Sequence, residues 1–129
     1  MTDEPIESRA KRIARHVLAI AMVTVGVLHF ANPTPFIRIV PSALPAPDLL
    51  VYLSGAIEIA LGLALVTRRT REKAAWGLVA LFVAVFPANV NMAVNHIALD
   101  PANPTPSWAA WARLPLQAVL IVWALWVRK

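Results

Sequence analysis

Apolar residues gather into four long runs along the chain, and short polar or proline-rich segments separate them. The runs cover residues 12–30, 49–67, 73–97 and 108–128. A helix needs about 17 to 25 residues to cross roughly 30 Å of hydrocarbon at about 1.5 Å per residue. The pattern therefore predicts an all-α protein, an integral membrane four-helix bundle that forms a single transmembrane domain over residues 1–129.

The composition supports a bilayer as the solvent of this chain. Hydrophobic residues make up 59% of it and charged residues only 15%, and few water-soluble domains of this size can hide so much apolar surface. No small-residue cleavage pattern follows the first run, so we expect that run to remain as a helix. The chain has no cysteine, which excludes disulfides and thiolate metal sites within it.

The basic residues are distributed unevenly between the two predicted sides. The net charge is +5, and ten basic residues fall on one side: Arg9, Lys11, Arg12, Arg15, Arg68, Arg69, Arg71, Lys73, Arg128 and Lys129. The positive-inside rule then places both termini in the cytoplasm, for a multi-pass protein of the bacterial cytoplasmic (inner) membrane. These charges are expected to contact lipid headgroups, and nucleic acid is not an expected partner.

The predicted outer loop, residues 31–48, has an unusual composition. Five prolines surround an apolar core, FIRIV, which a fully solvated loop does not need. We expect this segment to be re-entrant or interfacial, or to fold back over the mouth of the bundle as a lid.

Glu58 stands alone within the second apolar run, where an unpaired carboxylate costs several kcal/mol. Such a residue indicates a functional site by default. Counted at about 1.5 Å per residue, polar residues of the other runs fall at the middle and outer levels of the bundle. These residues are His29, Asn89, Asn91, Arg113 and Gln117. The sequence therefore predicts a polar cavity that opens toward the outer side.

Two interpretations of this polar set stay open. In the first it is a site: His29 and Glu58 exchange protons as catalytic residues, and a substrate carbonyl or oxyanion is bound by Asn89, Asn91, Arg113 and Gln117. In the second, Glu58 and Arg113 form an ion pair and the amides hold the helices together. The flanking Gly55 and Gly62 likewise indicate either close helix packing or space cleared beside the acid. No metal is predicted.

Five short motifs resemble one known family. They are HF-x-x-P from His29, I-V-P-x-x-L-P from Ile39, S-G-x-x-E from Ser54, F-P-A-N from Phe86 and R-L-P-L-Q from Arg113. Together they resemble the DoxX family of small four-helix membrane proteins over nearly the whole chain.

The resemblance implies a membrane component of a quinone-linked or oxidative-stress redox system. The expected partners are the lipid bilayer, a small lipophilic ligand such as a quinone, a redox partner subunit that supplies electrons, and further copies of the chain. The alternatives are a non-enzymatic protein that binds or transports a small molecule or lipid, or assists assembly, and an isomerase that moves a proton with Glu58 and His29. Whether the chain is itself an enzyme is left open.

Overall fold

The computed structural model describes residues 7–98, 101–102 and 106–129, and the regular elements in these ranges are all α-helices. The helices are α1 (Arg9–Ala31), α2 (Thr34–Arg38), α3 (Pro47–Leu65), α4 (Arg71–Val94) and α5 (Ser107–Trp126). Four of them, α1, α3, α4 and α5, are long and apolar enough to cross a membrane. The predicted all-helical architecture with four membrane-length helices is therefore confirmed.

The ends of these helices differ from the predicted ones by one to three residues. The helix predicted at 12–30 starts at Arg9, because the Ser8 side chain accepts a hydrogen bond from the Lys11 N–H at 3.2 Å and caps it. The helix predicted at 49–67 runs from Pro47 to Leu65, since proline suits the first helical turn.

The helices predicted at 73–97 and 108–128 are shifted in the same way. The first of these runs from Arg71 to Val94, and His96 beyond it adopts a left-handed backbone, with a φ of 51°, that cannot continue a helix. The last helix starts at Ser107 and ends at Trp126.

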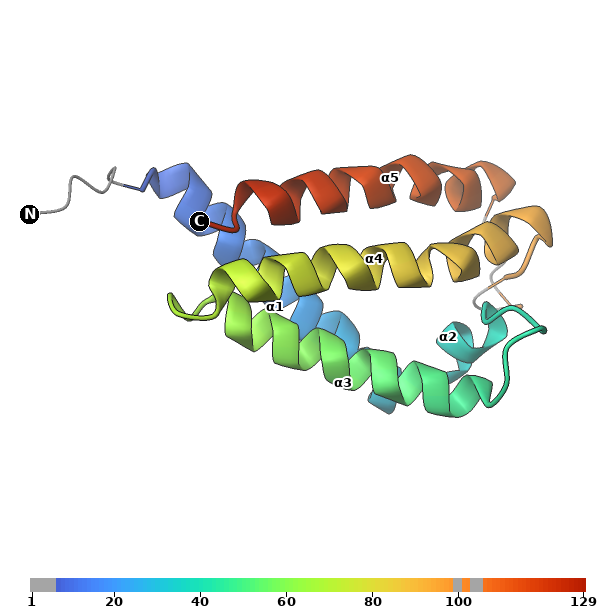
Figure 1. The fold of residues 1–129 in the computed structure, drawn as a ribbon. Coiled ribbons are helices and arrows are strands. Elements are labelled where there is room, and N and C mark those ends of the chain that lie inside the picture. Colours follow the sequence, from blue (N-terminus) through green and yellow to red (C-terminus); the bar gives the residue numbers. More distant parts are fainter. Residues whose placement is uncertain (1–6, 99–100, 103–105) are drawn as a thin grey trace, which may run out of the picture.

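The long helices form two tight pairs that diverge from one end of the molecule. α1 packs along α3, and α5 packs along α4 (Figure 1). α3 and α4 are joined by a short turn at the end where α1 begins and α5 finishes, and they separate toward the opposite end (Figure 1). We call these the basic end and the α2 end, because α2 lies between the separated helices at the latter.

Close contact between glycines holds α1 against α3. A Cβ atom added to Gly26 would lie 2.7 Å from the carbonyl oxygen of Gly55, and one added to Gly62 would lie 3.0 Å from that of Ala19. Neither Gly55 nor Gly62 lines the cavity described below. Of the two interpretations of these glycines, close packing is therefore confirmed.

The main hydrophobic core lies at the basic end, where all four long helices meet. Its buried side chains include Leu18, Leu65, Leu78, Ala124 and Val127. By contrast, at most 33% of the residues in any of the four candidate spans are buried within the chain. Most of the apolar surface thus points outward, as expected for helices that lie in hydrocarbon.

Candidate functional site

A cavity of about 610 Å³ lies between the two helix pairs, in the half of the molecule toward α2. Its wall is mostly apolar, and polar side chains from all four long helices contribute to it. The sequence-predicted residues among them are His29 of α1, Glu58 of α3, Asn89 of α4, and Arg113 and Gln117 of α5. A largely apolar cavity with a few convergent polar groups is typical of a small-molecule site.

His29 and Glu58 face each other across the α1–α3 contact. The His29 Nδ1 and Glu58 Oε2 atoms are 3.2 Å apart, and each residue is only 7% exposed. His29 Nδ1 also lies 2.7 Å from the carbonyl oxygen of Val25. Because a carbonyl oxygen only accepts, Nδ1 carries a proton, and its hydrogen bond goes to the backbone.

Glu58 is incompletely satisfied in this arrangement. Its Oε2 atom is buried and has no hydrogen-bond partner among the described residues. A buried carboxylate oxygen of this kind is costly and is characteristic of functional sites. The pair can therefore hold a proton, or donate one to a polar group within the cavity.

The α2 segment completes the site from outside the bundle. The Phe36 ring of α2 stacks on the His29 ring, with centroids 3.8 Å apart and an angle of 17° between the planes. Ile39 and Leu44, which follow α2, also line the cavity. The segment 31–48 thus folds back over the mouth of the bundle, and α2 is a helix that the sequence did not predict.

The amide groups on α4 and α5 are largely used within the protein. Asn89 donates from Nδ2 to Gln117 Oε1 at 2.5 Å, and Gln117 donates from Nε2 to the carbonyl oxygen of Phe82. Both residues line the cavity, but their mutual contact also fastens α5 to α4.

The structure places two of the predicted contacts differently. Asn91 does not line the cavity; its Nδ2 donates to the carbonyl oxygen of Ile39 at 3.0 Å and so anchors the α2 segment to α4. The ion pair between Glu58 and Arg113, which was one of the two interpretations of the polar set, is not among the ion pairs of the described residues. The reason is the packing order, since α1 lies directly on α3 whereas α5 belongs to the other helix pair.

Arg15 is buried, although it was expected from the sequence to contact lipid headgroups with the other basic residues. Its side chain is fully buried at the basic end and donates to the carbonyl oxygens of Val127 and Lys129, both at 2.9 Å. A signal for this burial existed, because Arg15 falls on the same helical face as the buried Leu18 and Met22.

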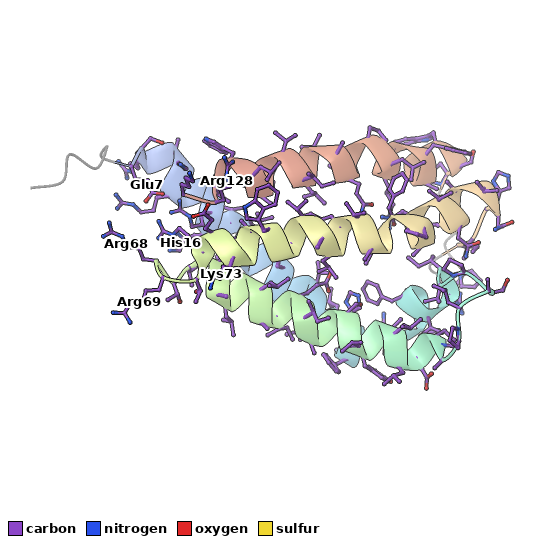
Figure 2. The ribbon with its side chains drawn as sticks, in the orientation of Figure 1. Glu7, His16, Arg68, Arg69, Lys73 and Arg128 are labelled. Carbon is purple, nitrogen blue, oxygen red and sulfur yellow. The ribbon has the colours of Figure 1, made fainter. Side chains whose placement is uncertain are left out.

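Glu7 lies at the basic end (Figure 2), where its carboxylate connects basic residues of α1 and α4. It pairs with the Arg15 guanidinium, and its carboxylate lies 3.9 Å from Arg71 Nη1 and 4.0 Å from Arg12 Nε. The hydrogen bond from Arg15 lowers the pKa of Glu7 below its ordinary value. Arg68, Arg69, Lys73 and Arg128 lie at the same end, as Figure 2 shows.

The fold and the cavity define a small all-helical protein with four candidate membrane spans around a largely apolar pocket that contains a few polar side chains. Among the described residues, no cluster of three or more histidine, aspartate or glutamate side chains is placed to hold a metal ion. The chain belongs to the family described as a domain of unknown function (DUF8561), whose model matches residues 18–128. No curated protein and no solved structure matches it.

Proposed function

We propose that this chain is a membrane protein of the DoxX type whose cavity binds a small lipophilic molecule with a polar head, within a quinone-linked or oxidative-stress redox system. The observation that carries the proposal is the His29 and Glu58 pair in the wall of an apolar cavity. A carboxylate at this depth of a candidate span is expensive, and ligand or proton sites are where membrane proteins retain such groups.

The residues of the cavity suit a ligand such as a quinone. A quinone carbonyl accepts hydrogen bonds, and Arg113 supplies a charged donor to the same cavity. Reduction of a quinone to a quinol takes two electrons and two protons. In this proposal His29 and Glu58 exchange the protons with the ligand, and a redox partner subunit supplies the electrons.

The charge distribution supports an orientation in the membrane. Basic side chains at the start of α1, at the turn between α3 and α4, and after α5 lie together at one end (Figure 2). By the positive-inside rule this end faces the cytoplasm of a bacterial cell, with both termini there. The cavity and α2 then lie toward the outer face of the cytoplasmic membrane.

A specific observation favours a second candidate function, a non-enzymatic binding, transport or assembly protein. The amides of Asn89, Asn91 and Gln117 make hydrogen bonds within the protein. If these amides serve mainly to hold helices together, they are not available to orient a substrate for reaction. The cavity then binds a ligand without transforming it.

Binding of decylubiquinone by the full chain in lipid nanodiscs tests the proposal. We expect Glu58→Gln and His29→Gln each to weaken binding by about tenfold or more, since a hydrogen bond to a charged group contributes roughly 1.5–3 kcal/mol. Matched controls are Glu72→Gln and His16→Gln, because both wild-type side chains are exposed outside the cavity. These controls should bind like the wild type.

Equilibrium binding and circular dichroism are measured together on all five proteins. Folded variants that bind the quinone as tightly as the wild type, or a wild type that does not bind it, refute the quinone proposal. Tight binding that survives both substitutions while helix packing loosens supports the architectural alternative.

A further inference from the structure

We propose that the cavity opens sideways, between α3 and α4, and that its ligand is a long-chain lipophile that enters from the hydrocarbon of the bilayer. This inference rests on the proposed function for the membrane setting, and it adds the route of entry and the ligand class. The cavity is bounded by the α2 end and by four flanks, each of which lies between two neighbouring long helices. These five boundaries differ in how exposed their cavity residues are.

The α2 end is covered. The Phe36 ring lies flat on His29, and the bond from Asn91 to the Ile39 carbonyl ties the covering segment to α4. Five prolines lie between residues 31 and 48, and proline restricts the backbone of each position it occupies. Entry from water at this end must pass this anchored segment, whose Leu44 lines the cavity and is 46% exposed.

Two flanks are closed by direct contact between neighbouring helices. On one flank, α1 and α3 approach so closely at Gly26 and Gly55 that no side chain fits between them. On another, the bonds among Phe82, Asn89 and Gln117 join α4 to α5 at the level of the cavity.

On the flank between α1 and α5, the two helices pack little against each other, and the cavity residues of α1 are buried or half-buried. The residues that α1 contributes to the cavity are Met22, Val25 and His29. Met22 and His29 are each only 7% exposed, and Val25 is half-buried. On α5, Leu116 lines the cavity and is 53% exposed, so exposed cavity residues on this flank come from one of the two helices only.

The flank between α3 and α4 differs from the others. The two helices touch near the basic end, where Gly77 lies against Leu61, and then separate toward the α2 end (Figure 1). Both helices here contribute residues that line the cavity and are also exposed. They are Leu53 and Ile57 of α3, which are 54% and 39% exposed, and Ala84 and Pro87 of α4.

The chemistry of this rim defines the class of ligand. All four rim residues are apolar, and they lie within candidate membrane spans. An opening of this kind faces lipid tails and admits apolar groups without loss of hydration. A ligand with its polar head at His29 and Glu58 can leave its chain between α3 and α4, so the 610 Å³ cavity limits the head group and not the length of the chain.

Photolabelling of the full chain in proteoliposomes tests this route without knowledge of the natural ligand. The probe is an iodophenyl diazirine, a carbene precursor that dissolves in the bilayer. Met22 is the reporter, because it is buried and lines the cavity. Ile20, which is 67% exposed on the same helix and outside the cavity, is the internal standard.

Ala84→Trp narrows the proposed opening, and Val83→Trp is its matched control, since Val83 is 59% exposed and does not line the cavity. We expect Ala84→Trp to lower Met22 labelling relative to Ile20 by about tenfold, equivalent to about 1.4 kcal/mol of added barrier to entry. Val83→Trp should leave the ratio unchanged. If Ala84→Trp does not fold, Ala88→Phe narrows the same side.

Either of two labelling results would overturn the proposed side opening. Unchanged labelling of Met22 in a folded Ala84→Trp or Ala88→Phe variant overturns the proposal. So does labelling of Met22 by a water-soluble sulfonated diazirine as strongly as by the bilayer probe, because that reagent enters at the α2 end. If decylubiquinone does not bind while Met22 labelling depends on residue 84, the proposed function fails and the side opening stands.

Discussion

Replacement of Gly55 by alanine is expected to separate α1 from α3 and to disturb the His29 and Glu58 pair. The added Cβ would lie 2.6 Å from His29 Cβ and 3.0 Å from the Gly26 carbonyl oxygen. Ordinary contact begins at 3.4 Å, so the closer contact is short by 0.8 Å (3.4 minus 2.6). Both neighbours are fixed to helix backbone, so the helices themselves must move.

The energetic effect has two opposing parts. Overpacking of this kind costs about 1–3 kcal/mol, and rigid neighbours place it near the upper value. Alanine recovers about 1 kcal/mol of helix propensity relative to glycine. The free energy of unfolding should therefore fall by about 2 kcal/mol, and decylubiquinone binding should weaken because His29 moves.

Gly77→Ala is the matched control. Its Cβ would meet Leu61 Cδ2 at 2.7 Å, but that atom is the end of a flexible side chain and can rotate away. We expect Gly77→Ala to be as stable as the wild type or up to about 1 kcal/mol more stable. The assay is unfolding by sodium dodecyl sulfate in mixed micelles, followed by circular dichroism. Equal stability of Gly55→Ala and Gly77→Ala would refute the inferred role of the glycine contact.

Three further predictions concern the hydrogen bonds at the two ends of the bundle. Arg15→Met should lower the unfolding free energy by about 3 kcal/mol, because it removes one partner of a buried network. Its control is Arg12→Met at an exposed position, which should change the unfolding free energy by less than about 0.5 kcal/mol in the same assay. Since the pKa of Glu7 is lowered from 4.5, its contribution to stability is complete above pH 4.5 and is lost as the pH falls toward the lower native pKa. Unfolding measured between neutral pH and acid should thus show a steeper loss for the wild type than for Glu7→Gln. Gln117→Leu and Asn89→Leu should each destabilise the protein by about 1–2 kcal/mol. The double variant should lose less stability than the sum of the two, because both substitutions remove the same hydrogen bond. Strict additivity in a double-mutant cycle would contradict that bond.

The sequence was sufficient to predict the four long helices and the level of the polar residues along them. Four apolar runs of membrane length leave little choice of element, and the rise per residue places Glu58 and Gln117 at similar depth. Both residues do line one cavity, in the half of the molecule away from the basic end. These features depend on position along a single helix, which spacing records directly.

The partners of those residues depend on how helices are arranged around one another, which spacing does not record. Glu58 meets His29 and not Arg113 because α1 is the neighbour of α3. Asn91 does not face the cavity, because its side chain donates a hydrogen bond to the carbonyl oxygen of Ile39 in the segment after α2. In the sequence Arg15 looks like the other basic residues near it. Only its position on the same helical face as Leu18 and Met22 distinguishes it.

The two helix pairs are joined at one end only. This arrangement separates the residues that stabilise the protein from those that determine which ligand binds. The main core and the Arg15 network lie where the pairs meet, whereas the cavity is bounded farther away by the segment around Phe36. Substitutions or length changes in that segment can therefore reshape the cavity while the junction stays intact. Members of the family with different outer segments are expected to share one scaffold and to differ in the molecules they accept.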